Sequence, residues 1–289
     1  MRNKAHTRTL RTLLEHARFE VLPTAKVEAA VIQHLPAGRT VTVTASPSKG
    51  LGASLALTER LVAHGYDVVP HLAARMVAGR TELVEIVDRL VSLGVTSVFV
   101  PAGDADPPAG PFPGSLDLLR ELTALGSPFA HVGITGYPES HPMIGDDLTV
   151  QAMWDKRQHA TYVVSNLTFD PALLRTWVTR IRQRGIAAPL FVGLPGPVER
   201  TKLLAMATKI GVGESTRFLS KHRSTFARIA VPGGFSPERF LDKSAPTLAD
   251  PRNLVRGLHL FTFNQVAETE RWRRDLLARL GSGIVDAAG

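Results

Sequence analysis

Short runs of β-branched and apolar residues recur along this chain and alternate with amphipathic stretches. The runs predict strands at residues 18–22, 41–45, 67–71, 96–101, 129–134, 161–165, 189–193 and 257–263. Residues 54–63, 82–93, 116–125 and 171–182 repeat apolar positions three and four residues apart, a pattern typical of helices that bury one face. Glycine follows these helices at positions that favour a helix C-terminus, namely Gly65, Gly94, Gly126 and Gly185. Strands that alternate with helices predict βαβ units and a parallel sheet.

Eight strand–helix alternations favour an α/β fold of the (β/α)8 TIM-barrel type over an open sheet. An open doubly wound sheet is the alternative, and it would place a glycine-rich phosphate-binding turn after its first strand. The segment after Leu22 reads Pro23-Thr24-Ala25-Lys26 and has no glycine. Because no long linker divides the chain, we expect residues 1–289 to form a single catalytic barrel domain, with residues 1–17 as a basic N-terminal extension or helix.

A barrel of this type carries its chemistry at the C-terminal ends of its strands. Polar side chains follow most of the predicted strands at that end. They are Glu20, Thr44, His71, Asp104, Tyr137, Glu139, His141, Asn166, Asn264 and Gln265. Apolar strands that end in polar groups predict a site at the barrel mouth.

The composition is typical of a cytoplasmic enzyme. Hydrophobic residues make up 44% of the chain, and the absence of cysteine excludes disulfides, thiolate metal sites and cysteine nucleophiles. No window approaches the roughly 20 apolar residues that a membrane span needs. The first 20 residues are polar and basic and lack the apolar core of a signal peptide. We therefore expect no membrane association.

The net charge of +8 comes partly from basic residues near the two ends of the chain. Aromatic residues are only 6% of the chain, and no nucleic-acid recognition module is evident, so we expect no nucleic-acid partner. Most of these basic residues are interpreted as solvated surface, although positive charge also attracts anionic small molecules. Glu139 and His141 are spaced like metal ligands, but no third ligand is indicated, and we predict no metal.

Several strand ends resemble those of the methylenetetrahydrofolate reductase family. The most specific segment is Gly136-Tyr137-Pro138-Glu139-Ser140-His141-Pro142, which resembles the family's Tyr-Pro-Glu-x-His-Pro after the fifth strand. Other matching segments are Phe19-Glu20, Pro70-His71-Leu72, Gly103-Asp104, Phe169-Asp170, Gly193-Leu194-Pro195-Gly196 and His259-Leu260-Phe261-Thr262-Phe263-Asn264. Each segment alone is weakly specific, but seven in the same order, over residues 18–272, identify the resemblance.

The resemblance implies reduction of 5,10-methylenetetrahydrofolate to 5-methyltetrahydrofolate, a step of one-carbon metabolism that serves methionine biosynthesis. Opening of the one-carbon bridge needs a proton donor at the leaving nitrogen, and a hydride then adds to the iminium carbon. Glu20 is the candidate acid, because its apolar neighbours favour a protonated carboxyl group; without the resemblance it would be a surface glutamate. Asp104 is implied as a catalytic and pterin-binding carboxylate, the alternative being a turn residue. Asn166, at a family glutamine position, and Gln265 are further candidates for binding the folate.

The family also binds a flavin that relays the hydride. Thr44, His71, Tyr137, His141 and Lys156 stand at positions that resemble its cofactor-binding residues, and Arg75 is a candidate for dinucleotide phosphates. Structural roles are the alternative at each. The flavin-binding pattern is altered, however, because alanine replaces an aromatic residue at Ala45 and an arginine at Ala102. Family Asp, Asn and Arg positions align with Thr149, Ala152 and Asp155.

We therefore expect NADH or NADPH to act as the hydride donor, with direct transfer to the folate and without FAD. An ordinary FAD-dependent reductase and a non-catalytic folate-binding barrel are the alternatives within the family. Outside it, an aldolase or isomerase barrel acting on phosphorylated substrates is a further alternative. Such an enzyme favours a glycine-rich phosphate site after the last two strands, whereas the last strand here ends in Asn264-Gln265.

Overall fold

A computed structural model describes residues 3–139, 145–197 and 236–285 of the chain. All eight predicted strands are present, with ends that differ by at most a few residues from those expected. They are β1 (Arg18–Val21), β2 (Thr40–Val43), β3 (Asp67–Pro70), β4 (Ser97–Phe99), β5 (His131–Gly136), β6 (Tyr162–Ser165), β7 (Leu190–Pro195) and β8 (Val255–Phe261). The neighbouring strands pair in parallel, which confirms the (β/α)8 barrel.

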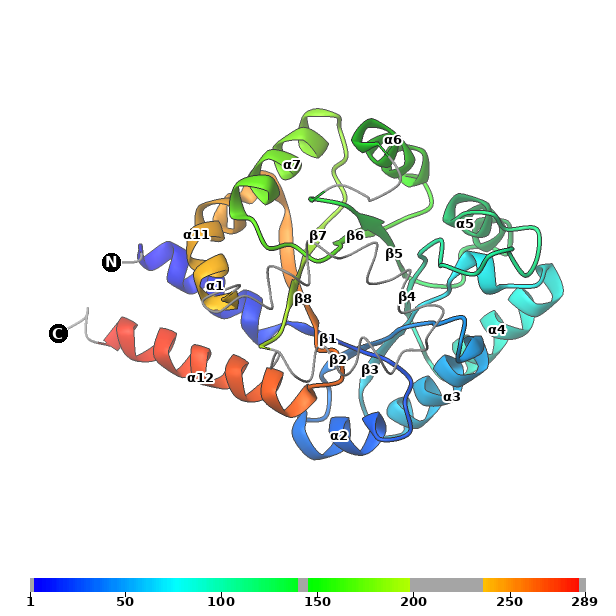
Figure 1. The fold of residues 1–289 in the computed structure, drawn as a ribbon, viewed down its shortest axis with the longest axis horizontal. Helices are drawn as coiled ribbons and strands as arrows, with labels where there is room; N and C mark the ends of the chain where they lie inside the picture. The colour runs from blue at the N-terminus through cyan, green and yellow to red at the C-terminus, as the bar shows by residue number, and fades with distance from the viewer. Residues whose placement is uncertain (1–2, 140–144, 198–235, 286–289) are drawn as a thin grey trace.

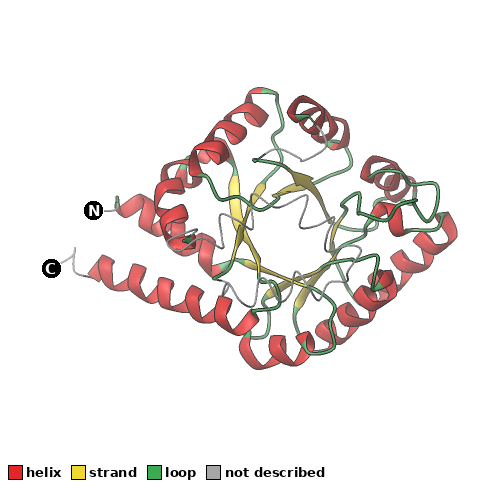
Figure 2. Cartoon of the chain, viewed as in Figure 1, coloured by secondary structure: helices red, strands yellow, loops and turns green. Residues whose placement is uncertain are grey.

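Helices surround the ring of strands (Figures 1 and 2). They are α1 (Lys4–Glu15), α2 (Val27–His34), α3 (Gly50–Ala63), α4 (Arg80–Ser92), α5 (Ser115–Ala124), α6 (Asp146–Lys156), α7 (Pro171–Gln183), α11 (Pro237–Ala249) and α12 (Val266–Val285), with short 3-10 turns η1 (Ala74–Met76) and η2 (Pro251–Asn253). Helices α2 to α12 follow one another around the ring in chain order, whereas the basic N-terminal segment forms α1, which lies beside α11 and α12 and also packs against β8. None of the helices in the described ranges is long and apolar enough to cross a membrane.

Local signals in the sequence account for where these helices begin and end. The four glycines expected after helices all have positive φ, between 75° and 87°, a conformation that glycine adopts without steric penalty. At the start of α7, the side chain of Asp170 accepts a hydrogen bond from the amide of Ala172 at 2.7 Å. Pro171 occupies the first turn, where its missing N–H has no helical partner to lose.

The sheet closes between β3 and β4 only near its C-terminal end. The strand order is β3-β2-β1-β8-β7-β6-β5-β4, so these two strands are its edges. A parallel bridge pairs His71 with Phe99, and the amide of Leu72 donates to the carbonyl of Phe99 at 2.8 Å. A further bond runs from the amide of Ala74 to the carbonyl of Pro101 at 3.0 Å. His71, one of the residues expected at the mouth, is therefore part of this closure.

Near the N-terminal ends of the strands, the barrel interior is filled by side chains. Aromatic rings of Tyr162 and Phe191 meet edge to face inside the barrel, with centroids 5.4 Å apart. The guanidinium of Arg18 lies over both rings, 3.7 Å from the centroid of Phe191 and 4.7 Å from that of Tyr162. Gly133 and Gly257 leave room for the rings, since a Cβ at either would lie 2.4 Å or 2.6 Å from a ring carbon. The mouth at the other end is where polar side chains gather.

Replacing Gly133 by alanine should therefore destabilise the barrel. The added methyl group would meet the ring of Tyr162 inside a closed sheet, and overpacking of this kind costs about 1–3 kcal/mol. Gly52→Ala is the matched control, because nothing lies within 4 Å of its Cβ position in α3, and alanine there should stabilise the helix by up to about 1 kcal/mol. Urea unfolding of both variants measures the difference, and equal stabilities would contradict the packing described.

Candidate functional site

Glu20 stands on the inner face of β1, where its backbone is fixed by the end of β8. The hydroxyl of Thr262 donates to the carbonyl of Glu20 at 2.6 Å. Two residues later, Asn264 accepts a hydrogen bond from the amide of Leu22 at 2.8 Å and donates to the carbonyl of Leu22 at 3.1 Å. Asn264, which we expected at the mouth, therefore connects the end of β8 to the end of β1 through two hydrogen bonds.

Two buried histidines approach the same carboxylate oxygen of Glu20. Nε2 of His259, on β8, lies 2.9 Å from Oε2, within hydrogen-bond distance. Nε2 of His71 lies 3.8 Å from that oxygen. The side chain of Glu20 is 14% exposed, and those of His259 and His71 are 2% and 8% exposed. Among the described residues, the carboxyl group of Glu20 is thus flanked by two imidazoles, and only a small part of its surface is open to water.

The pKa of His71 is lowered to about 4, chiefly by burial; Glu20 opposes this shift, and His259 adds to it to a smaller extent. The imidazole of His71 is therefore neutral at pH 7, and its approach to Glu20 is not an ion pair at that pH. Its ring packs against Phe99 with centroids 4.7 Å apart. Nε2 of His71 is buried and has no hydrogen-bond partner among the described residues, and neither has Oγ1 of Thr44 on the neighbouring strand.

Asp104 and Tyr137 lie close together at the ends of β4 and β5. Burial raises the pKa of Tyr137, the negative charge of Asp104 raises it further, and a hydrogen bond with Thr135 opposes the rise. Asp104 is exposed and follows Gly103, which has a φ of 86° and would meet Ala73 if it carried a Cβ. The predicted carboxylate is thus held on a tight turn at the same barrel end as Glu20.

Other expected ligands are partly engaged with the protein itself. Oδ1 of Asn166 accepts a hydrogen bond from the amide of the next residue, Leu167, at 2.8 Å. The carboxylate of Glu139 accepts from the amides of Phe169 and Asp170 at 2.5 Å and 2.7 Å and so ties the loop after β5 to the start of α7. Gln265 lies directly before α12. His141 lies outside the described residues.

The two cations expected near the cofactor differ in their surroundings. Arg75 donates to the carbonyls of Ala105 and Pro113 at 2.6 Å and 3.2 Å and to the carboxylate of Asp106 at 3.2 Å, and so holds the loop after β4. Lys156, at the end of α6, is partly buried, and burial lowers the pKa of its amine. Arg75 thus holds its own loop, whereas the Lys156 amine makes no hydrogen bond among the described residues.

His259 is the residue of the cluster to which the sequence assigned no role. It lies in a matching segment, but a histidine inside a buried strand is equally consistent with packing. The signal that would have identified it is the alternation of β8, because Gly257, His259 and Phe261 share the inner face. His259 pairs in register with Arg18, which puts it directly below the level of Glu20. Within the described residues no group of three His, Asp or Glu has the geometry of a metal site.

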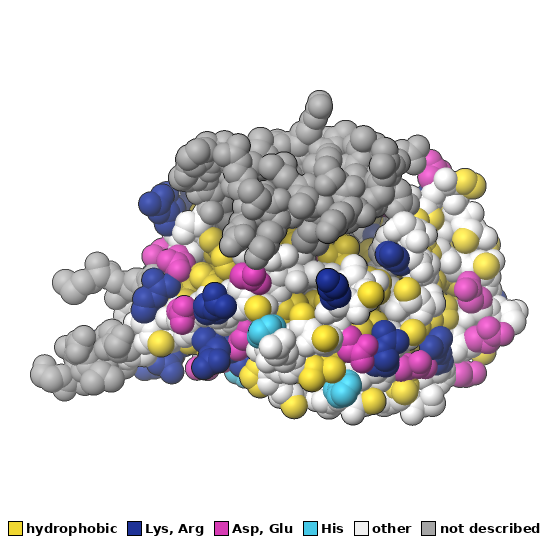
Figure 3. Space-filling model, turned by 60° about the horizontal axis from the view of Figure 1, so that its bottom comes forward, with side chains coloured by type: hydrophobic (Ala, Val, Ile, Leu, Met, Phe, Trp, Pro, Cys, Tyr) yellow, Lys and Arg dark blue, Asp and Glu magenta, His cyan; other side chains and the backbone are white. Residues whose placement is uncertain are grey.

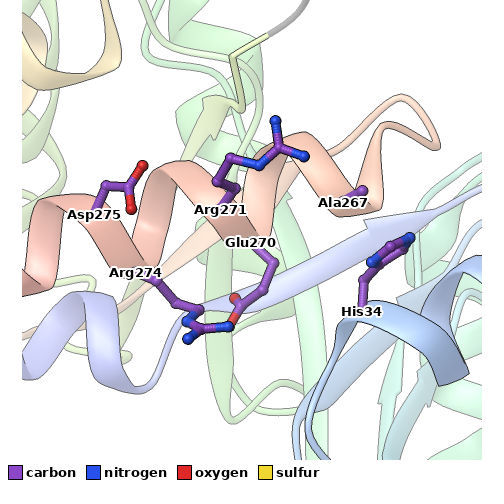
Figure 4. Close-up of a pocket in the computed structure, with 6 residues that line it drawn as sticks. All are labelled: His34, Ala267, Glu270, Arg271, Arg274 and Asp275. Carbon is purple, nitrogen blue, oxygen red and sulfur yellow. The ribbon is translucent and has the colours of Figure 1, made fainter.

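A solvent-filled hollow also lies outside the barrel wall, between α2 and α12, and has a volume of about 340 Å³ (Figure 4). Its lining is charged: His34, Ala267, Glu270, Arg271, Arg274 and Asp275. Glu270 is paired with Arg273 at 2.7 Å within α12, and the described residues that line the hollow come from helices α2 and α12. Basic and acidic side chains are mixed on the face drawn in Figure 3. We therefore place the candidate site at the mouth.

Known proteins resemble this chain in sequence and in fold. The family model described as methylenetetrahydrofolate reductase matches residues 26–216. Dihydropteroate synthase from Thermus thermophilus in complex with 6HMPPP is 13% identical, with a TM-score of 0.46 over 93% of this chain and 94% of that one. Dihydropteroate synthase from Yersinia pestis with a pterine–sulfa conjugate is 12% identical, with a TM-score of 0.44 over 93% and 95%. A putative deoxyribose-phosphate aldolase from Toxoplasma gondii ME49 is 11% identical, with a TM-score of 0.43 over 94% and 99%.

The buried neutral His71 predicts a specific loss of stability in acid. Its pKa is about 4 in the folded protein and about 6.5 in an unfolded chain, so the unfolded state binds the extra proton first. Above pH 6.5 the neutral ring of His71 makes its full contribution to the free energy of unfolding. As the pH drops from 6.5 toward 4, this free energy falls by about 3 kcal/mol at most. The difference in unfolding free energy between wild type and His71→Leu should follow that course in urea titrations. His64→Leu, at an exposed helix end, controls for loss of a histidine, and a pH-independent difference for His71 would show that its ring is not buried and neutral.

Proposed function

Because the chain belongs to the methylenetetrahydrofolate reductase family, we propose that it reduces 5,10-methylenetetrahydrofolate to 5-methyltetrahydrofolate with NADH or NADPH as the hydride donor. The observation that carries this proposal is the carboxyl group of Glu20, set at the barrel mouth within 2.9 Å of His259. A half-buried carboxyl group at the strand ends is suited to act as the acid that opening of the one-carbon bridge requires. A protein that only binds folate has no need of it.

Glu20 protonates the leaving nitrogen of the bridge, and the C–N bond to that nitrogen breaks. The bridge carbon becomes an iminium, and the hydride of the nicotinamide then adds to it. A cation that develops in a site with little water is stabilised by fixed negative charge nearby. Asp104 supplies such a charge at the same barrel end and accepts hydrogen bonds from the pterin N–H groups. Asn166, through its side-chain amide NH2 group, and Gln265 complete the folate contacts.

The described residues fit the family's flavin poorly. Ala45 and Ala102 carry methyl groups that donate no hydrogen bond, in place of an aromatic and an arginine side chain. Asp155 is exposed and accepts a hydrogen bond from Gln151 at 2.8 Å, so a carboxylate faces solvent where the family alignment has an arginine. The hydroxyl of Thr149 donates to a backbone carbonyl of its own helix. Each charge-assisted hydrogen bond lost to a diphosphate removes about 1.5–3 kcal/mol of binding, and Asp155 adds repulsion.

Direct hydride transfer from NAD(P)H to the folate is therefore the mechanism we favour. The nicotinamide occupies the mouth beside His71, whose neutral ring adds no charge there, with Thr44 and Tyr137 among the other groups that line it. Lys156 is the candidate for the dinucleotide phosphates. His71, Tyr137 and Lys156 are also the features that a FAD-dependent reductase would keep, and that ordinary family mechanism is the second candidate.

Glu20→Gln tests the acid. The amide keeps the shape of the side chain but holds no transferable proton, so folate affinity should persist while turnover falls by about 10²–10⁴. The measurement is NADH oxidation with and without 5,10-methylenetetrahydrofolate, together with titration of 5-methyltetrahydrofolate. Glu85→Gln, on the exposed side of α4, is the matched control. Near-normal turnover of Glu20→Gln would assign the acid elsewhere, and an inactive wild type would contradict the reductase function itself.

Direct transfer also has a kinetic signature. Both substrates must be bound together, so initial-rate lines at several fixed folate concentrations should intersect. A flavin relay releases NAD⁺ before folate binds and gives the parallel lines of ping-pong kinetics. We expect the purified protein to be colourless and its activity to be unchanged by added FAD. Parallel lines, or activity that depends on FAD, would instead establish the FAD-dependent mechanism.

A further inference from the structure

Among the residues that the structure describes, His259 finds a hydrogen-bond partner for one of its two ring nitrogens. Nε2 lies 2.9 Å from Oε2 of Glu20. Nδ1 is buried and has no hydrogen-bond partner among the described residues. The ring itself is fixed from one side by Phe261, with centroids 4.8 Å apart and planes inclined at 68°. Its position within a paired strand leaves it 2% exposed.

The unpaired Nδ1 determines which nitrogen carries the proton. A buried N–H without an acceptor loses the full hydration of a donor. A neutral ring protonated on Nε2 avoids that loss, since its N–H points to Glu20 and Nδ1 keeps only a lone pair. The opposite tautomer would donate from Nδ1 into a place without an acceptor. His259 is therefore the donor in its contact with Glu20, and Oε2 is the acceptor.

We propose that His259 is a positioning residue for the acid: its Nε2–H holds Oε2 of Glu20, so that the transferable proton is carried and delivered by Oε1. This inference rests on the proposed reductase function. Within the described chain Oε2 has two histidine nitrogens within 3.8 Å, whereas no hydrogen bond or ion pair is formed at Oε1. A carboxyl group whose one oxygen already accepts an N–H keeps its proton on the other oxygen.

The proposed step can be written with every bond and proton accounted for. The Oε1–H bond breaks and an N–H bond forms on the leaving nitrogen of the folate, as the bridge C–N bond breaks. The negative charge left on Glu20 is stabilised by the same Nε2–H, and charge-assisted hydrogen bonds are the stronger ones. The nicotinamide supplies the hydride and is oxidised, the bridge carbon is reduced, and Glu20 takes one proton from solvent before the next turnover.

The groups that face Glu20 from the surrounding strands are few. On β1, Arg18 shares its inner face two residues earlier and stacks on aromatic rings. On β2, Thr42 pairs with it in register and carries no charge. After β3 comes the neutral His71, and β8 contributes His259. Among the described residues His259 is thus the nearest donor to the carboxylate, and its removal should change the pH dependence of the acid.

His259→Leu and His259→Gln form the test pair. Leucine fills the space without a donor, whereas glutamine places an N–H near the position of Nε2. We expect His259→Leu to lower kcat by about 10–100-fold through misalignment of the acid, with KM for folate little changed. Its alkaline fall of kcat should move up by about one pH unit, because a carboxylate without its donor is less stable and holds the proton to higher pH. His259→Gln should recover most of the turnover and the original profile.

Tyr162→Phe controls for stability, because it also removes a buried hydrogen bond, to the carbonyl of Val98 at 3.2 Å, but at the opposite end of the interior. Its pH profile should match wild type. Should His259→Leu fail to fold, ¹⁵N spectra of histidine-labelled wild type give the answer independently, with His259 protonated on Nε2 only. An active wild type with an unmoved alkaline limb in His259→Leu, or protonation on Nδ1, overturns the role of His259 alone. An inactive wild type overturns the reductase function and this role with it.

Discussion

The pairing of β1 with β8 is the contact on which the mouth depends. In the observed register Arg18 stands opposite His259, so the inner face presents Glu20 one level above the imidazole that binds it. A shift of one residue would turn every side chain of β8 to the other face and would carry His259 into the helical layer. The bonds of Thr262 to Glu20 and of Asn264 to Leu22 act against such a shift. The register of β1 against β8 therefore determines whether Glu20 and His259 can form their hydrogen bond.

The interior is divided into a filled end and a polar end. Rings of Tyr162 and Phe191, the guanidinium of Arg18 and the two glycines that make room for them close the lower part. Water is thereby kept from the underside of the site, and electrostatic interactions are stronger where water is excluded. The contact between Glu20 and His259 gains from that exclusion, and so does the low pKa of His71. Packing at one end of the barrel thus strengthens the contact between Glu20 and His259 at the other end and favours the low pKa of His71.

Periodicity and turn residues were enough to predict the strands, the glycine caps and the placement of Glu20 and His71, because these are properties of local sequence within a repeating fold. The partners of those residues were not predictable in the same way. The contact of His259 depends on the register of β8 against β1, which no local pattern encodes. Arg75 holds the loop after β4, and Glu139 caps the approach to α7, through side chains whose acceptors or donors lie 30 or more residues away. Such contacts follow from the path of loops, and sequence patterns say little about that path.

Glu20 and His259 are 239 residues apart in the chain. On the ribosome, β1 is made first, and the strand that supplies both its hydrogen-bonding neighbour and its latch is made last among the eight. A nascent chain therefore carries Glu20 on an unpaired edge through most of its synthesis, and edges of this kind are exposed to mispairing. Helix α1 precedes β1 and packs against α11, α12 and β8, all of them late elements. The contact between Glu20 and His259 thus forms only after β8 has been made, and a chain that ends before β8 lacks it.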